Sequence, residues 1–416
     1  MKKFLALLLS LSMVLALSAC GGTKSDDTTK ADETKTDAPA ETATDFKVGF
    51  IMLHDENSTY DLNFMNGAKE ACANLGLSDD QVIFRTNIPE GQECYDKAAE
   101  LADAGCNIVF ADSFGHEPFM IDAAKKYPDV QFCHSTGTRA HTEEGLKNYH
   151  NAFASIYEGR YLAGIAAGMK LNEMIDAGQF TKDEAKIGYV GAFTYAEVIS
   201  GYTSFFLGAR SVCPTATMEV TFTGSWYDEA LEKEGAQQLI ANGCKLISQH
   251  ADSMGAPTAC ETAGVPNVSY NGSTKEAGPN TYIISSRIDW APYYEYAITA
   301  AMNGEAIDAD WTGTLATGSV VLTDLNENVA AEGTAEAIAD ATAKLESGEL
   351  HVFDCSTFTV DGQPVTSYMA DVDTDPDYTP DTEVVQDGYL AESTARSAPY
   401  FQLMIDGIDL LDTNFG

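Results

Sequence analysis

Residues 47–71 read KVGFIMLHDENSTYDLNFMNGAKEA, and the fold of the whole chain can be argued outward from this stretch. The apolar residues 48–53 stop abruptly at His54, a polar and acidic run follows, and a helical pattern begins near Phe64. A short continuous apolar strand is typical of a parallel sheet that is covered on both faces. The stretch therefore predicts a buried strand that leaves its sheet through HDENSTYD, so the function depends on what this strand end faces.

The same alternation continues along the chain. Further strands are expected at 81–88, 107–113 and 130–137, with helices at 64–76, 94–105 and 116–128. It restarts with strands at 186–193, 217–226, 244–252 and 265–272 and helices at 197–214, 228–243 and 257–264. One more strand and helix are expected within 281–304. The segment TGSVVLTDL follows at 317–325, then a helix at 334–345 and an irregular acidic tail. Alternation of this kind predicts an α/β protein with two doubly wound parallel-sheet lobes joined by a hinge.

The first 45 residues have a different character. Residues 1–20, MKKFLALLLSLSMVLALSAC, combine two lysines, an apolar run and small residues before a cysteine, which predicts a secretory signal peptide. The last four residues resemble a bacterial lipobox, and this resemblance implies a lipid on Cys20. Residues 21–45 contain no aromatic residue and no Leu, Ile or Val, so we expect a disordered acidic tether. We assign 46–153 plus 280–312 to lobe 1, and 154–279 plus 313–416 to lobe 2.

Composition limits the partners. The chain of 416 residues carries 63 Asp and Glu against 24 Lys and Arg, a formal charge of −39. Such a surface repels phosphate backbones, so no nucleic-acid partner is expected. It also repels anionic membrane lipids, so attachment to the membrane requires the covalent lipid on Cys20. Eight cysteines follow Cys20 without a CxxC pair, and we expect them to be unpaired, buried and hydrophobic in character.

In open α/β sheets, ligands bind outside the carboxyl ends of the strands, and these ends carry a recurring set of residue types. Aromatic side chains alternate with carboxylates, while Arg139, Lys275 and Arg287 are the cations nearby. Aromatic faces with polar edges suit an uncharged ring-shaped ligand. Nucleosides, nucleobases and sugars all qualify. The candidate ligand-binding residues are Tyr60, Asp61, Ser113, Phe114, Phe193, Glu197, Trp226, Asp252, Asn271, Gly272, Asp289 and Trp290.

Several motifs together resemble the basic membrane protein family of substrate-binding lipoproteins. They are KVGFI, YEGRYLAGIAAG, KIGYVGAF, EVISGYTSFFLGARSVCP, SWYDEALEKEGAQQLIANG and QHADS, spread over residues 46 to about 325. The resemblance implies a type I periplasmic-binding fold, a purine nucleoside or nucleobase as ligand, an ABC permease as partner and a location on the outer face of the bacterial membrane. It implies that Tyr60 stacks on the ligand ring and that Phe193 matches the VGAF turn of the second lobe. We predict that the lobes close around the ligand, with its ring between Tyr60 and Phe193. Asn271 stands where nucleoside-binding members often carry an acidic residue.

Three alternatives remain open. The first is an enzyme, for which no Walker A loop, GxGxxG, GxSxG or HExxH motif is present, so no catalytic residue and no cofactor are expected. The second is metal capture by histidines near strand ends, but scattered loop residues rarely converge on one ion, so no metal is expected. The third is a sugar receptor of an ABC importer, which needs the same aromatic platforms and carboxylates as a nucleoside receptor.

Overall fold

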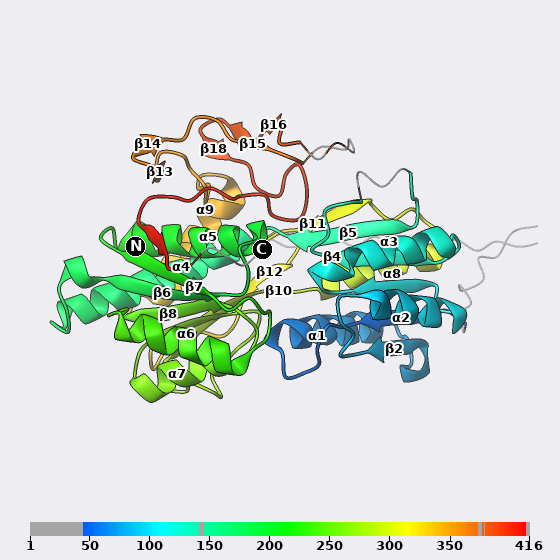
Figure 1. The fold of residues 1–416 in the computed structure, drawn as a ribbon, viewed down its shortest axis with the longest axis horizontal. Coiled ribbons are helices and arrows are strands. Elements are labelled where there is room, and N and C mark those ends of the chain that lie inside the picture. The colour runs from blue at the N-terminus through cyan, green and yellow to red at the C-terminus, as the bar shows by residue number, and fades with distance from the viewer. Residues whose placement is uncertain (1–44, 141–144, 373–376, 378, 413–416) are drawn as a thin grey trace, which may run out of the picture. The chain divides into compact units, whose positions relative to one another are not determined.

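The structure is a computed structural model that describes residues 45–140, 145–372, 377 and 379–412. The predicted signal peptide, Cys20 and all but the last residue of the predicted tether lie outside these residues. From Asp45 onward the chain forms one compact unit with two parallel sheets (Figure 1). Within the described residues, no helix has both the length and the apolar character that a membrane span requires.

The first sheet has six strands in the order β11-β5-β4-β3-β1-β2, all parallel. Its bounds are β1 (Val48–Ile51), β2 (Val82–Arg85), β3 (Ile108–Ala111), β4 (Gln131–Ser135), β5 (Tyr149–Ala154) and β11 (Asp310–Gly313). Residues alternate between faces, so Phe50 packs among the aromatic side chains of α1 (Thr59–Asn74) and α8 (Ala291–Asn303). Ile51 packs on the opposite face, under α2 (Gln92–Asp103) and α3 (Glu117–Lys126). Both faces are covered, as the apolar run at 48–53 predicts.

The second sheet has seven strands in the order β12-β10-β9-β8-β6-β7-β19, and β12 alone of these runs antiparallel. Its bounds are β6 (Lys186–Gly191), β7 (Thr217–Phe222), β8 (Leu246–His250), β9 (Asn267–Tyr270), β10 (Tyr282–Ile288), β12 (Val320–Leu322) and β19 (Ile408–Leu410). Helices α4 (Ile156–Asp176) and α5 (Ala196–Val212) cover one face, and α6 (Glu229–Ala241) and α7 (Gly255–Ala263) cover the other (Figure 1). Helix α9 (Thr334–Ser347) packs on α4.

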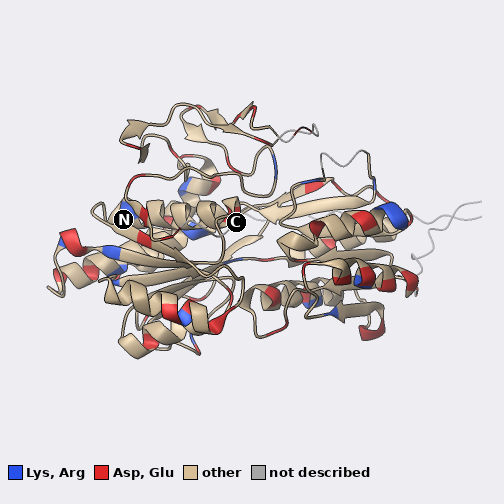
Figure 2. Ribbon diagram, in the orientation of Figure 1, with Lys and Arg blue, Asp and Glu red and all other residues tan. Residues whose placement is uncertain are grey.

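The last part of the chain lies over the second lobe as short hairpins. They pair β13 (Thr359–Val360) with β14 (Gln363–Pro364), β15 (Met369–Ala370) with β16 (Thr382–Glu383), and β17 (Val385–Gln386) with β18 (Tyr389–Leu390). Buried Phe353, Phe358 and Phe401 join the core of the second lobe, so the tail belongs to the fold. Figure 2 shows Asp and Glu spread over both lobes, in keeping with the acidic composition.

The structure differs from the sequence-based description in a few elements. Strands β5, β11 and β19 were not predicted, because YHNAFA runs into a helical pattern and DWTG and IDL are short and polar. Residues 280–288 were predicted in lobe 1, but β10 pairs with β9 and β12 in the second sheet. The physical reason is that Ile283 and Ile284 are buried in the core of the second lobe. The chain therefore crosses to lobe 1 after Ile288.

The eight cysteines that follow Cys20 are free and buried, as predicted. Burial raises the pKa of the Cys133 thiol to about 12, and it raises the pKa of Cys72 to about 12 as well. These thiols therefore stay protonated and contribute as small apolar side chains.

Helices α4 and α5 approach so closely that their backbones touch at glycines. A Cβ atom at Gly208 would collide with the carbonyl oxygen of Tyr161, and one at Gly164 would collide with that of Phe205. Neither obstacle is a flexible side chain, so an added methyl group has to push the helices apart. The motifs YLAGIAAG and SFFLGAR thus hold the centre of the second lobe together.

We therefore expect Gly208→Ala to destabilise the protein by about 1–3 kcal/mol, because overpacking forces a backbone shift. Chemical denaturation measures the change in the free energy of unfolding. The matched control is Gly235→Ala in α6, where the nearest atom to the new methyl group is the side-chain Cγ2 of Thr221 at 3.3 Å. An equal loss in both variants would contradict the proposed role of the α4–α5 contact.

Candidate functional site

A narrow cavity lies where the carboxyl ends of both sheets meet. It is lined by Leu53, Tyr60, Ser113, Phe114, Thr136, Glu197, Trp226, His250 and Asp252. In the first sheet the strand order reverses beside β1 and β3, and in the second it reverses beside β6 and β8. Such reversals leave a crevice at the strand ends, which is where open α/β sheets bind ligands.

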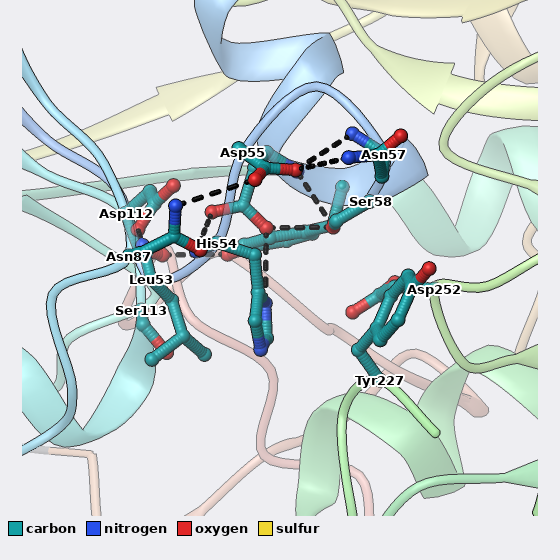
Figure 3. A network of polar contacts seen from close by, with 12 residues as sticks. Leu53, His54, Asp55, Asn57, Ser58, Asn87, Asp112, Ser113, Tyr227 and Asp252 are labelled. Atoms are coloured by element: carbon teal, nitrogen blue, oxygen red, sulfur yellow. Dashed lines mark hydrogen bonds and ion pairs between the residues drawn. The ribbon is translucent and has the colours of Figure 1, made fainter. Parts of the chain in front are cut away.

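The HDENSTYD segment turns from β1 into α1 through a compact polar cluster (Figure 3). Ser58 is the N-cap of α1, and its hydroxyl lies 2.6 Å from a carboxylate oxygen of Asp61. The other carboxylate oxygen of Asp61 accepts the backbone N–H of His54 at 2.7 Å. Burial opposes ionisation of Asp61, but the hydrogen bonds from His54 and Ser58 outweigh it and lower the pKa of Asp61. The buried Asp61 carboxylate therefore holds the segment in place through its hydrogen bonds to His54 and Ser58, and it does not line the cavity.

Tyr60 reaches the cavity from the first turn of α1. Its hydroxyl donates to the carbonyl oxygen of Asp112 at 2.7 Å, and its ring packs against Phe64 at 4.8 Å between centroids. Burial raises the pKa of the Tyr60 hydroxyl well above its usual value, so it remains a neutral donor. Both ends of the side chain are held, so the ring presents a fixed apolar surface to the cavity.

Aromatic side chains also approach from the second lobe. Phe193 stacks on Tyr195 with 5.1 Å between centroids and packs edge-on against Trp226 at 4.9 Å. Tyr195 in turn lies 5.3 Å from Phe114 of the first lobe. Trp226 lines the cavity, whereas Phe193 supports Trp226 and Tyr195 and does not line the cavity. Tyr60 and Trp226 therefore both line the cavity, whereas Phe193, which was predicted to pair with Tyr60 around a ligand, packs against Trp226.

Asp252 follows β8 and joins the two lobes. Its carbonyl oxygen accepts the backbone N–H of Thr59 at 2.9 Å and the hydroxyl of Thr59 at 3.2 Å. Its carboxyl group accepts a hydrogen bond from the Asn271 side chain at 3.2 Å. Burial, reinforced by Glu232, Asp61 and Glu197 nearby, raises the pKa of Asp252 well above its usual value. The carboxyl group can therefore be protonated and can donate as well as accept a hydrogen bond.

His250 and Glu197 form a second polar pair in the cavity. The two side chains are 3.4 Å apart, and the His250 ring packs on Tyr270 at 4.5 Å. Behind Tyr270 lies the fully buried guanidinium of Arg160, 4.7 Å from the ring centroid. Burial lowers the pKa of His250, so its ring is mostly neutral, and it can act as donor on one nitrogen and acceptor on the other.

The structure brings half of the predicted residues together. Those that line the cavity are Tyr60, Ser113, Phe114, Glu197, Trp226 and Asp252. A separate cavity of about 750 Å³ beside α1 is bordered by Asn271, Gly272 and Asp289. Trp290 is stacked on Phe64 at 4.2 Å in the core of lobe 1 and is 1 % exposed, so it lines neither of the two cavities described above.

Sequence reasoning did not select Leu53, Thr136 or Asp112, and it noted His250 at a strand end without including it among the ligand-binding residues. Leu53 and Thr136 have no distinctive chemistry, although each directly follows or ends a predicted strand. Asp112 is fully buried at the end of β3, and burial together with the neighbouring Asp61 raises the pKa of its carboxyl well above the usual value. Its position after the apolar run IVFA was the signal that could have identified it.

The histidines near the strand ends do not converge on an ion. Within the described residues, no group of three or more His, Cys, Asp or Glu side chains is arranged to hold a metal. His116 and His134 instead bond to backbone carbonyls of Ile88 and Ser113, at 2.9 and 2.6 Å. The arrangement is therefore suited to binding through hydrogen bonds and ring contacts.

Glu232 of α6 fixes two segments that line the cavity. One of its carboxyl oxygens accepts the backbone N–H of Asp228 at 3.1 Å, and both accept that of Ser253, at 3.2 and 3.1 Å. Trp226 lies two residues before Asp228, and Asp252 directly precedes Ser253, so Glu232 holds both cavity-lining residues in place. Burial raises the pKa of Glu232 to about 7, although the hydrogen bonds from Ser253 and Asp228 oppose the shift.

Comparison with known proteins shows a clear relationship. A family model described as ABC transporter substrate-binding protein PnrA-like, Bmp, matches residues 50–350. A purine-binding protein of Brucella abortus is 30 % identical over 74 % of this chain and 83 % of its own length. The candidate ABC transporter glucose-binding protein TsgA13 of Haloferax volcanii is 34 % identical over 62 % of this chain, and the match spans 62 % of its own length.

Solved structures share the fold. A solute-binding protein of an ABC transporter system from Aeropyrum pernix aligns over 74 % of this chain and 93 % of its own, with a TM-score of 0.63 and 18 % identity. A second one, from Conexibacter woesei, aligns over 74 % of this chain and 98 % of its own, with a TM-score of 0.58 and 20 % identity. These similarities support the two-lobed α/β fold.

The raised pKa of Glu232 makes a testable contribution to stability. Its folded pKa of about 7 lies above the ordinary value of 4.5, so the folded state favours the protonated form. This contribution is fully present below pH 4.5 and is lost as pH rises through 7, by about 3 kcal/mol at most. Glu232→Gln should flatten this part of the stability–pH profile, measured by urea unfolding from pH 4.5 to 8. Glu234→Gln, on the same helix, is the control, and an unchanged profile in Glu232→Gln would refute the assignment.

Proposed function

The chain belongs to the Bmp family of PnrA-like ABC transporter substrate-binding proteins, and from this premise we propose that it binds a purine nucleoside or nucleobase in the cavity between its lobes. The observation that carries the proposal is the pairing of Tyr60 and Trp226, which reach the cavity from opposite lobes. Two aromatic side chains on either side of a narrow space favour a flat ring, whose faces stack while its edge forms hydrogen bonds.

The charges around the cavity support an uncharged ligand. None of the nine described residues that line it is Lys or Arg, so a phosphate or a carboxylate would find no cationic partner there. The carboxyl groups of Asp112 and Asp252 have raised pKa values because they are buried. Asp252 lines the cavity, so its carboxyl group can donate to a ring nitrogen or carbonyl oxygen when protonated, and can accept from a ring N–H or a hydroxyl when ionised. A purine edge offers both kinds of group.

Closure of the two lobes would couple binding to transport. Lobe 1 supplies Tyr60 and Ser113, and lobe 2 supplies Trp226 and Asp252, so a ligand completes its contacts only when the lobes are together. The closed form would then dock on an ABC permease, which moves the ligand through the membrane. A lipid on Cys20 would hold the receptor on the outer face of the membrane, with residues 21–45 as a tether. We propose no turnover of the ligand, in keeping with a family of substrate-binding proteins.

A sugar is the alternative ligand. One relative carries a glucose-binding description, and aromatic platforms with carboxylates also bind pyranose rings. The two ligand classes differ in thickness and in edge chemistry. A purine stacks on both faces, whereas a pyranose presents axial hydrogens or hydroxyls to at least one of them.

The deciding experiment is a thermal-shift panel of purine nucleosides, nucleobases and sugars. A ligand that binds only the folded state stabilises it by about 2.7 kcal/mol when the ligand concentration is 100 times Kd. A purine should therefore raise the melting temperature clearly. Pyrimidine nucleosides serve as the control for ring size. A shift produced by glucose and by no purine would transfer the proposal to sugars.

Replacing Tyr60 tests the stacking contact directly. We expect Tyr60→Ala to weaken purine binding by about 1–3 kcal/mol, the range for loss of one aromatic–base stack, measured by isothermal titration calorimetry. Tyr60→Phe should retain most of the affinity, because it keeps the ring and loses only the bond to the Asp112 carbonyl. Tyr127→Ala, which lies at the end of α3 away from the cavity, is the matched control. Unchanged affinity in Tyr60→Ala would remove this residue from the site.

A further inference from the structure

The C-terminal segment 391–402 lies beyond the residues that the family model matches, yet it contacts both lobes. On the side of lobe 2, the Tyr157 hydroxyl of α4 donates to the carbonyl oxygen of Glu392 at 3.2 Å. On the side of lobe 1, the backbone N–H of Ser397 donates to the Asp310 carboxylate of β11 at 2.7 Å. The segment therefore passes from one lobe to the other beside the cleft.

The segment holds its shape through its own buried polar groups. One carboxyl oxygen of Glu392 accepts the backbone N–H groups of Tyr400 and Phe401, at 3.0 and 3.3 Å. The Arg396 guanidinium donates to the carbonyl oxygens of Asp371, Ala398 and Pro399, at 3.1, 3.3 and 3.0 Å. These bonds fix the backbone of the loop, while the other carboxyl oxygen of Glu392 and the Ser397 hydroxyl are buried without a hydrogen-bond partner in the described part of the chain.

The segment forms one wall of a second compartment of about 820 Å³. The tail contributes Arg396, Ala398, Pro399 and Gln402, and the remaining wall comes from both lobes. Phe114, Thr136 and Glu197 line this compartment and also the interlobe cavity. The ring contact between Phe114 and Tyr195 stands on the boundary, and Phe114 is 38 % exposed. The two spaces therefore adjoin each other at Phe114, Thr136 and Glu197, of which Phe114 is exposed.

Thr136, on this shared wall, has two features that point to a ligand. It adopts φ = 71°, a left-handed conformation that is costly for a β-branched residue. Its side chain is 3 % exposed, and within the described part of the chain its hydroxyl has no hydrogen-bond partner. Nearby contacts hold it in place: its own N–H donates to the Ala152 carbonyl at 3.0 Å, and Glu117 accepts the N–H of Thr138 at 2.9 Å. The strain thus fixes a desolvated hydroxyl between the two spaces.

We propose that the C-terminal segment 391–402 is part of the binding site, and that the compartment it walls receives an uncharged, hydroxyl-bearing substituent of the ligand, which Thr136 contacts. The inference rests on the proposed function and narrows it: the ring lies between Tyr60 and Trp226, and a sugar attached to the ring extends toward Gln402. A nucleoside then uses both spaces, whereas a free nucleobase uses the interlobe cavity alone.

The charges of the compartment favour hydroxyl groups over phosphate. Glu197 lines the compartment as well as the cavity, and it would repel an anion. Arg396 is the cation of this wall, and it already donates to three backbone carbonyls. Hydroxyl groups, which both donate and accept, suit Thr136, Gln402 and Glu197 equally.

The test compares adenine, adenosine and adenosine monophosphate, and the matching guanine series, by isothermal titration calorimetry on the full chain and two variants. Gln402→Trp fills the compartment from an exposed position of the tail, and Thr136→Val removes the hydroxyl while keeping the side-chain shape. Met369→Trp, at an exposed position of β15 that lines none of the cavities described above, is the control for a bulky substitution on the tail. Melting curves without ligand report whether each variant is folded.

We expect the unaltered chain to bind each nucleoside more tightly than its base. Gln402→Trp should weaken nucleoside binding by about tenfold or more, and Thr136→Val by about three- to tenfold, while base affinity changes less than about twofold. Equal effects on base and nucleoside, or no effect in either variant, would overturn the inference while leaving the proposed function in place. If adenosine monophosphate bound more tightly than adenosine and adenine, the inference that the compartment receives an uncharged substituent would be wrong. Failure of every purine to bind the unaltered chain would overturn the proposed function and the inference with it.

Discussion

A hydrogen bond between two backbones joins the lobes at the centre of the site. The N–H of Thr59 donates to the carbonyl oxygen of Asp252, so the first residue of α1 is tied to the end of β8. Helix N-termini carry unsatisfied N–H groups, and here one of them is satisfied by the other lobe. This bond brings the strand ends of both sheets face to face. Tyr60 and the Asp252 carboxyl group, which are adjacent to the bonded atoms, reach the cavity as a consequence.

The buried carboxyl groups around this contact differ in how readily they ionise. Asp61 is ionised because His54 and Ser58 supply hydrogen bonds, whereas Asp112 is pushed toward the neutral form by burial and by Asp61 itself. The pKa values of two neighbouring carboxyl groups are thus shifted in opposite directions.

Much of this architecture could be predicted from the sequence. Continuous apolar runs such as VGFI and IVFA are sufficient to define buried parallel strands, and the strand ends then locate the cleft. Phe193 and Trp290 show the limit of this reasoning. Both are aromatic residues at strand ends, but Phe193 packs behind Trp226, and Trp290 packs into the core of lobe 1 against Phe64. Which way a ring turns depends on tertiary packing, which no local pattern encodes. Thr136 was missed for a similar reason, since its backbone conformation and its unpaired hydroxyl are visible only in three dimensions.

The eight buried thiols determine how the protein responds to oxidising and reducing conditions. In the described chain none of them forms a cross-link, and each has its sulfur shielded by packed side chains. Folding therefore needs no oxidant and no shuffling catalyst, and the same native state is available in a reducing or an oxidising compartment. Alkylating reagents and peroxide would find little thiolate to attack, so the receptor should keep its shape through changes of redox potential that would inactivate a protein with exposed cysteines.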